Sequence, residues 1–174
     1  MSSTVQLVAA AQKGDQEAFA ELVRRYQRVT ITTAWAVLHD FHAAQDVAQE
    51  SFVMAFRKLS TLRHPKAFGP WLLKLTHRAA VQHSAQCPVT VPLESVAESV
   101  AMNEENGWPE RFADVALQIG SLPDAEREVI VFRYVDGLSV NEIAEMTSSP
   151  IGSITKRISR ALSRLRDVVA RSEI

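Results

Sequence analysis

Apolar residues recur at every third or fourth position through most of this chain, and no stretch shows the sustained alternation of a half-buried β-strand. The spacing is clearest over residues 19–37, 44–59 and 68–79. It places apolar side chains on one face of a helix, where they can pack against a neighbouring helix. The sequence therefore predicts an all-α fold.

An acidic segment divides the helical patterns into two blocks. Residues 89–110 contain five glutamates and no lysine or arginine, and residues 87–110 contain three prolines. Prolines and weak periodicity disfavour a regular helix. We expect two small helical domains, residues 1–88 and residues 110–174, joined by an acidic linker at residues 89–109.

Composition and the N-terminal sequence exclude several classes of protein. Hydrophobic residues make up 47% of the chain and charged residues 22%, which is a soluble globular balance. No apolar run approaches the length of about 18 residues that a membrane helix needs, and the N-terminus lacks a signal-peptide pattern. Cys87 is the single cysteine, which suits a reducing compartment. These features predict a cytoplasmic protein without membrane insertion.

Two helices joined by a short turn are predicted near the C-terminus. Ser139 and Glu142 have the S-x-x-E spacing of a capping box, which begins a short helix. Ser149 and Pro150 then mark a turn, with Ser149 as the candidate cap of a last helix over about residues 151–170. A short helix, a tight turn and a longer helix form a helix-turn-helix motif.

The last of these helices has a basic face opposite its apolar stripe, at about 100° per residue. In the second helix of a helix-turn-helix, arginine can read guanine edges in the major groove, while other cations and hydroxyls contact phosphates. A solvated basic surface without a partner is the alternative for such a helix taken alone. The candidate DNA contacts are Ser153, Thr155, Lys156, Arg157, Arg160 and Arg164.

Residues 122–166 resemble region 4 of the extracytoplasmic-function (ECF, group 4) sigma factors of bacterial RNA polymerase. Thr147 and Ser148 replace the leucine and glycine that are usual in the turn. The resemblance implies that the last helix binds the –35 promoter element. The matching residues are Leu122, Pro123, Arg127, Glu128, Val129, Glu142, Ile143, Ala144, Gly152, Ser153, Ile154, Arg157, Arg160 and Ala161.

The first block resembles region 2 of the same family in "GDQEAFAELVRRY" and "HAAQDVAQESFVMAFRKL", which carries the D-x-x-Q-E signature at Asp46, Gln49 and Glu50. Asp46 and Glu50 are four residues apart, so they share a helix face and form an anionic patch suited to a basic partner. In the family this face docks on the coiled coil of the polymerase β′ subunit. An ordinary exposed acidic turn is the alternative. The two resemblances cover about residues 7–85 and 110–169, in the family's order.

Together, the resemblances imply a sigma factor that directs core RNA polymerase to specific promoters and is not an enzyme by itself. Its partners would be core RNA polymerase, through the β′ coiled coil and the β flap, promoter DNA and an anti-sigma factor. The linker would run toward the RNA exit path of polymerase, or would serve only to join the domains. A sigma-like or stand-alone helix-turn-helix regulator that does not open promoters is the alternative.

The helix expected to bind the –10 element departs from the family pattern. "WLLKLTHRAAVQHSAQ" keeps Trp71 and Leu72 but lacks the polar and basic residues that usually follow. Either the protein recognises an unusual –10 sequence, or its first domain melts DNA poorly. Phe68 or His77 would have to stack on a flipped base, although Phe68 also fits the core. The remaining –10 candidates are Arg57, Lys58, Arg63, Lys66, Lys74 and Arg78.

Other chemistry has little support in the sequence. His77, His83 and Cys87 carry metal-binding groups, but no second cysteine and no H-E-x-x-H motif accompanies them. The chain has no phosphate-binding loop and no nucleophile elbow. We expect no cofactor, no metal ion and no catalytic residue.

Overall fold

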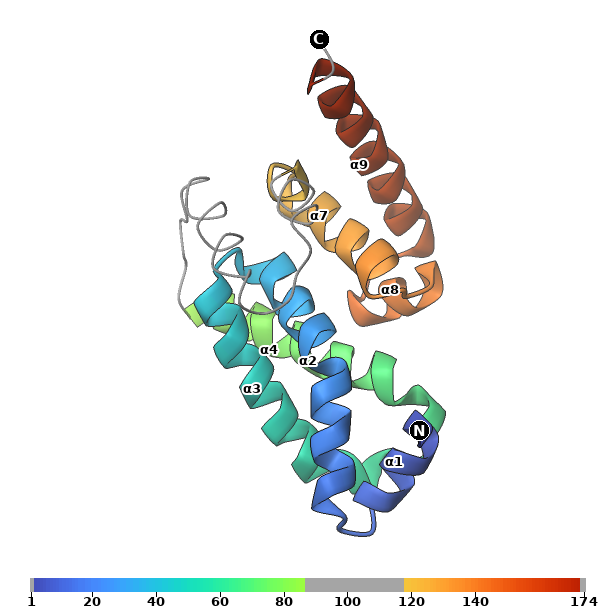
Figure 1. Ribbon diagram of the computed structural model, residues 1–174. Coiled ribbons are helices and arrows are strands. Elements are labelled where there is room, and N and C mark those ends of the chain that lie inside the picture. The colour runs from blue at the N-terminus through green and yellow to red at the C-terminus, as the bar shows by residue number, and fades with distance from the viewer. Residues whose placement is uncertain (1, 87–117, 173–174) are drawn as a thin grey trace.

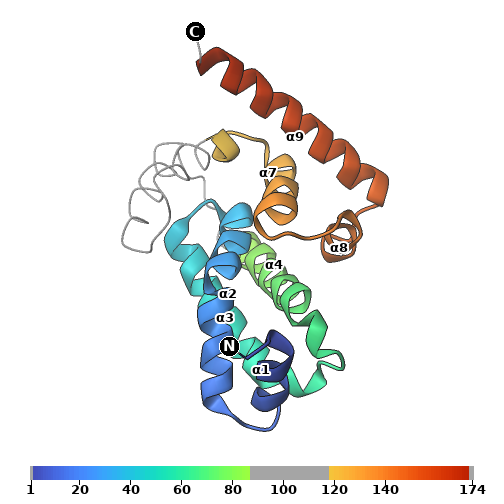
Figure 2. The ribbon, with the colours of Figure 1, turned by 45° about the vertical axis from the view of Figure 1, so that its right-hand side comes forward.

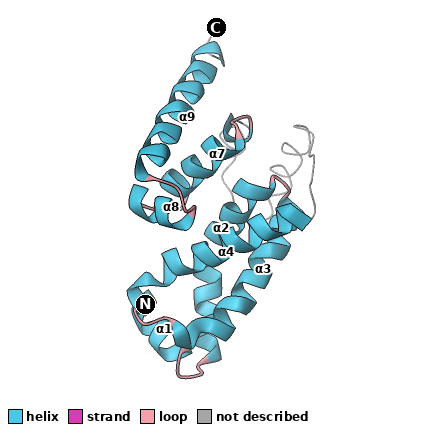
Figure 3. Cartoon of the chain, turned by 180° about the vertical axis from the view of Figure 1, so that it is seen from behind, coloured by secondary structure: helices cyan, strands magenta, loops and turns pink. Residues whose placement is uncertain are grey.

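The structure is a computed structural model that describes residues 2–86 and 118–172, with side chains as far as residue 167. Every regular element in these residues is a helix, as Figure 3 shows. The predicted all-α fold is confirmed. The predicted linker at residues 89–109 and the start of the second block, residues 110–117, lie outside the described residues.

The first block consists of four α-helices that pack against one another (Figure 1). Its helices are α1 (Thr4–Ala11), α2 (Gln16–Leu38), α3 (Phe41–Lys58) and α4 (Phe68–Gln86), with the short 3₁₀ helices η1 (Leu59–Thr61) and η2 (Pro65–Ala67) between α3 and α4. Asp15 and Asp40 each accept a backbone N–H bond at the start of a helix, from Ala18 at 3.0 Å and from Ala43 at 2.9 Å. These caps satisfy amides that would otherwise lack a partner.

The core of this bundle includes Leu22, Phe52, Phe68 and Leu72, which are all buried. The ring of Phe68 packs edge-on against Tyr26, with 5.2 Å between the ring centroids, and Phe68 is completely inaccessible to solvent. The suggestion that Phe68 could stack on a flipped base is therefore wrong for this structure. Its position follows from the helical spacing, which places it on the buried face of α4.

In the described residues, the second block starts with helical residues 118–120, and α7 (Asp124–Ile130) follows and continues into the π-helical segment η4 (Val131–Val135). Gly137 follows with φ +72°, a left-handed conformation that costs glycine little. The helix-turn-helix consists of α8 (Val140–Met146) and α9 (Ile151–Ser172), and both bonds of the predicted capping box between Ser139 and Glu142 are formed.

The turn between α8 and α9 differs from the prediction in one detail. Ser149 does not cap α9, because α9 begins after Pro150, whose carbonyl accepts the first helical bonds. The Ser149 hydroxyl instead donates to the carbonyl of Thr147. Ser148, where the family usually has glycine, takes the left-handed conformation with φ +51°. The turn is thus formed with serine in a conformation that favours glycine.

The two blocks pack against each other. Segments α7 and η4 contact α2, and α8 contacts α4, an arrangement visible in Figures 1 and 2. A single hydrophobic core continues across the contact. It includes Trp35, Leu38 and Leu73 from the first block and Ile130, Phe132 and Ile143 from the second.

Candidate polymerase and promoter interfaces

Helix α9 separates an apolar side from a basic side, as predicted. Ile154 and Ala161 are fully buried, and Ile158 and Leu165 are half-buried against the preceding helices. In Figure 1 the helix extends away from the first block. Of the predicted DNA contacts, Ser153 and Arg157 are half-buried, and Thr155, Lys156, Arg160 and Arg164 are exposed.

The cations of this face are not equivalent. Lys156, Arg157 and Arg160 form no ion pair among the residues that the structure describes. Arg164 lies 3.0 Å (Nε to Oε2) from Glu126 of α7, a carboxylate that is only 8% exposed. Because a buried carboxylate needs a compensating charge, Arg164 has a structural role in the free protein. The three unpaired cations are the better candidates for DNA contacts.

The predicted polymerase-binding residues share one side of α3. Asp46, Gln49 and Glu50 are exposed, while Val47 and Ala48 between them are buried. The two carboxylates take part in no ion pair within the described part of the chain. The next turn adds the exposed apolar residue Val53, which is 51% exposed. The surface is an anionic patch continued by an apolar side chain, which suits a basic helix with an apolar contact of its own.

The –10 candidates lie around η1, η2 and α4. Arg57, Lys58, Arg63, Lys66 and Arg78 are exposed. Lys74 is half-buried, and its Nζ lies 2.8 Å from Glu145 Oε1 on α8. This contact also lowers the pKa of Glu145, first through the hydrogen bond and then through the charge of Lys74. Lys74 is therefore occupied by the second block in this arrangement, whereas the other five are accessible.

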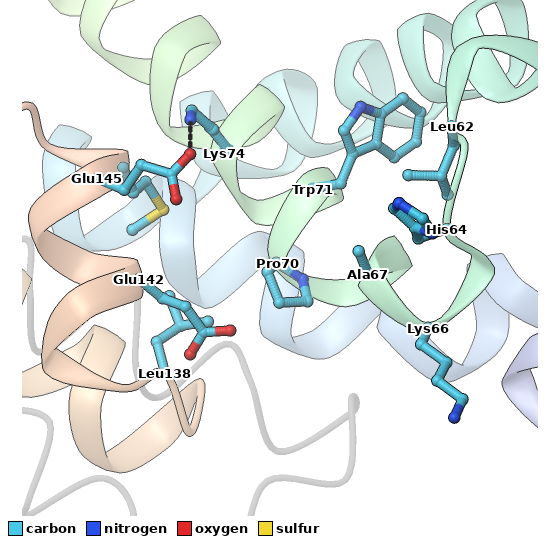
Figure 4. A pocket seen from close by; sticks show the side chains of 11 residues that line it. Leu62, His64, Lys66, Ala67, Pro70, Trp71, Lys74, Leu138, Glu142 and Glu145 are labelled. Carbon is cyan, nitrogen blue, oxygen red and sulfur yellow. Dashed lines mark hydrogen bonds and ion pairs between the residues drawn. The ribbon is translucent and has the colours of Figure 1, made fainter.

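A groove of about 510 Å³ lies between the first block and α8. Figure 4 shows Pro70 and Trp71 on one side of it, and Leu138 and Glu142 on the other, with the Lys74–Glu145 pair closing one end. Its walls come from both blocks, so the groove exists only while the two blocks are in contact.

His77 does not face solvent. It is 8% exposed, its ring packs edge-on against Phe132 with 5.5 Å between centroids, and its Nε2 lies 3.5 Å from Glu128 Oε2 on α7. The suggestion that His77 stacks on a base therefore does not fit this arrangement. No group of three possible metal ligands occurs in residues 2–86 and 118–172, and Cys87 of the suggested metal site lies outside them.

Arg127 has a role that the sequence did not reveal beyond its match to the family pattern. Its buried guanidinium donates to the carbonyls of Gly120 (2.8 Å) and Leu122 (3.1 Å), and across the contact to Ala36 at the end of α2 (3.3 Å). It also contacts His39 and pairs with Asp124. A positive group at the C-terminal end of α2 is favourable because the helix dipole is negative there. The sequence feature that could have indicated a buried role for Arg127 is its position close to the apolar run "VIVF".

The charges around Arg127 affect each other. Burial, and then the positive charge of Arg127, lowers the pKa of His39. Burial also lowers the pKa of Arg127, while Asp124 opposes that change. This cluster joins α7 to the end of α2 and is part of the contact between the blocks.

In the described residues, no helix has the length and hydropathy needed to cross a membrane.

Two family models match the chain in the predicted order. The model for Sigma-70 region 2 matches residues 22–86, and the model for Sigma-70, region 4 matches residues 113–165. The first match contains the acidic face of α3 and all of α4, and the second contains the helix-turn-helix. A stand-alone helix-turn-helix regulator is not favoured, since it would need no region 2.

Curated relatives show the same family over nearly the whole chain. The RNA polymerase sigma-H factor of Pseudomonas aeruginosa is 34% identical, over 90% of this chain and 88% of the relative. The ECF RNA polymerase sigma-E factor of Escherichia coli K12 is 33% identical, over 89% and 88%. The ECF RNA polymerase sigma factor SigW of Bacillus subtilis is 28% identical, over 91% and 92%.

Solved structures agree with this fold. CnrH, in complex with the cytosolic domain of CnrY, has a TM-score of 0.68 and 26% identity, over 95% of this chain and 96% of that chain. The sigma factor RpoE of Bartonella quintana, in complex with the anti-sigma factor NepR, has a TM-score of 0.64 and 17% identity, over 87% and 96%, which supports the fold alone. The chain belongs to the ECF sigma factors of the sigma-70 family, transcription initiation factors that direct core RNA polymerase to specific promoters.

Proposed function

We propose that separate surfaces of the two blocks bind core polymerase and promoter DNA. Asp46, Gln49 and Glu50 on α3 bind core polymerase through the β′ coiled coil. The second block binds the β flap and places the basic side of α9 in the major groove of the –35 element. The first block, within residues 1–88, contacts the –10 region, and residues 110–174 form the –35-binding domain.

The observation that carries this proposal is the state of the basic side of α9. Lys156, Arg157 and Arg160 lie in the first half of the second helix of a helix-turn-helix, without ion pairs in the described residues. Arginine and lysine at such positions can reach base edges and phosphates. Ser153 and Thr155 add hydroxyls near the start of the helix, and Arg164 could join only by leaving Glu126.

For the –10 element, the exposed cations Arg57, Lys58, Arg63, Lys66 and Arg78 supply the contacts, and Lys74 joins them once it leaves Glu145. We expect an unusual –10 sequence, because the set differs from the family pattern. CnrH and RpoE were each solved with a bound partner, and the partner of RpoE is described as an anti-sigma factor. We infer that an anti-sigma factor also holds this chain, in the cytoplasm.

The first experiment is co-migration of the purified protein with bacterial core polymerase in size exclusion. The double variant Asp46→Lys/Glu50→Lys reverses the charge of the patch and should lose co-migration, while its helical content in circular dichroism stays unchanged. Like charges placed against a basic helix cost on the order of several kcal/mol, which should be enough to weaken the complex strongly.

A matched control makes the same change in net charge at positions outside α3. Glu17→Lys/Asp167→Lys alters two exposed acids, on α2 and α9. This control should still co-migrate. Retained binding by the α3 variant would place the interface elsewhere, and equal loss in both variants would indicate a response to net charge alone.

A further inference from the structure

Asp136 is a half-buried residue whose carboxyl group lies at the contact between the two blocks. It follows the π-helical segment η4, and its Oδ2 lies 2.7 Å from the hydroxyl of Thr33 on α2. Its other oxygen, Oδ1, is buried without a hydrogen-bond partner among the described residues. No cation of the described residues forms an ion pair with it. An ionised carboxylate in such a place would have lost its hydration without compensation.

The hydroxyl of Thr33 indicates which form Asp136 takes. It also lies 2.9 Å from the carbonyl of Val29. A hydroxyl has one proton to donate. If Asp136 is neutral, its O–H donates to Thr33, and Thr33 donates to Val29, so both contacts are hydrogen bonds. If Asp136 is ionised, Thr33 can satisfy only one of the two acceptors.

The position of Asp136 at the end of a helix favours the same form. Its backbone N–H donates to the carbonyl of Val131 at 3.0 Å, so its side chain is at the C-terminal end of η4. The helix dipole is negative there and disfavours an anion. Burial raises the pKa of Asp136 to about 7, with the hydrogen bond of Thr33 acting in the opposite direction.

We propose that Thr33 and Asp136 form a proton-linked latch between the two blocks: the closed arrangement holds Asp136 as the neutral acid, and separation of the blocks exposes it and releases a proton. Closure matters for DNA binding because the same contact covers His77 and pairs Lys74 on α4. The proposal concerns this chain alone and does not depend on which residues contact DNA.

The direction of the pH effect follows from proton linkage. In the open form we expect Asp136, then exposed to water, to have the ordinary pKa of 3.8, whereas burial raises it to about 7 in the closed form. Between these values the closed form binds more protons, so the closing equilibrium weakens as pH rises. For this group alone it should fall about tenfold between pH 6 and pH 8.

Other ionisable groups also lie at the contact between the blocks. On α2 and α7, His39, Arg127 and Asp124 form the cluster already described, and the lowered pKa of His39 makes its protonation oppose closure on the acid side. The pairs His77–Glu128 and Lys74–Glu145 link α4 to α7 and α8. Arg133, near Asp136 on η4, donates to the carbonyl of Leu138. All of these remain in the Asp136→Asn variant, so its difference from wild type isolates Asp136.

The test measures the distance between the blocks by energy transfer in the full chain. Cys87 is replaced by serine, and dyes are attached to cysteines introduced at the exposed residues Ser60 and Ser163. We expect the wild type to open between pH 6 and pH 8, with a closing equilibrium that falls about tenfold more than that of Asp136→Asn. Asp167→Asn removes an exposed acid of the same block and should behave as wild type.

The same pH response in wild type and Asp136→Asn would overturn the latch, as would loss of the response in Asp167→Asn. If Asp136→Asn fails to fold, the carboxyl carbon of Asp136 can be titrated by NMR in the unaltered protein. A midpoint near 7 supports the proposal, and a midpoint near 4 overturns it. Neither measurement needs polymerase or DNA, so failure of the latch and failure of the proposed docking on polymerase are distinguishable.

Discussion

The two helices proposed to contact promoter DNA present their basic residues differently. On α9, Lys156, Arg157 and Arg160 form no ion pair in the described residues, and the helix extends away from the first block (Figure 2). On α4, Lys74 is paired with Glu145 and His77 is buried against Phe132. The –35 surface is thus accessible in the closed arrangement, and part of the –10 surface is covered.

This difference has a physical origin. The basic side of α9 is opposite a narrow apolar stripe, so its own block can bury one side and leave the other in water. Helix α4 has an apolar stripe toward α2 and α3, and a second contact through Leu73, His77 and Ala80 that the second block fills. A helix with two buried sides has less surface left for nucleic acid. In the closed arrangement Lys74 and His77 are engaged by the second block, so we expect that they can contact the –10 region only after the blocks separate.

The largest expected effect comes from Phe132→Ala, which removes the ring that packs on His77 of α4. Phe132 is fully buried and holds the ring of His77. Its loss should lower the free energy of unfolding by about 3–5 kcal/mol, because a large cavity remains. Urea unfolding measures this, and hydrogen exchange should rise in α4 more than in α3.

A control within the same segment is Tyr134→Ala. Tyr134 is 58% exposed, and its loss should change the free energy of unfolding by less than about 0.5 kcal/mol. A cost below about 1 kcal/mol for Phe132→Ala would mean that the contact between the blocks contributes little.

The second prediction tests whether the accessible basic side of α9 contacts the –35 element. Arg157→Ala should weaken holoenzyme binding to a –35-dependent promoter by about 1–3 kcal/mol if the guanidinium reads a base. Arg166→Ala removes an exposed arginine from a different side of the same helix and should change binding little. Equal losses from the two variants would argue for general attraction to phosphates, and unchanged initiation in Arg157→Ala would exclude this residue as a –35 contact.

The smallest effect concerns the turn that orients α9. Ser148→Gly should raise the free energy of unfolding by up to about 1 kcal/mol, because φ +51° costs a residue with a Cβ atom but not glycine. Thermal unfolding measures the gain. Ser149→Gly, at a neighbouring position without positive φ, should give no gain. Stabilisation by both variants would assign the effect to something other than backbone conformation.

Several features of the fold and of the candidate surfaces could be predicted because they depend on neighbours in the sequence. The caps at Asp15 and Ser139 involve residues three positions apart. The exposed side of α3 with Asp46 and Glu50 follows from 3.6 residues per turn. Ser149 was predicted to cap α9, but the helix begins at Ile151, so Pro150 and not Ser149 is the residue at the boundary.

The sequence by itself determined that the chain is helical, where most of its helices begin, and which sides of α3 and α9 meet water, because these properties arise within one or two helical turns. Only the tertiary structure decided that Phe68 and His77 are buried, that Arg127 reaches Ala36, and that Asp136 meets Thr33. The last two contacts join residues 91 and 103 positions apart in the chain. Local periodicity cannot predict contacts between residues so far apart in the sequence. These contacts follow from how the apolar sides of the two blocks pack together.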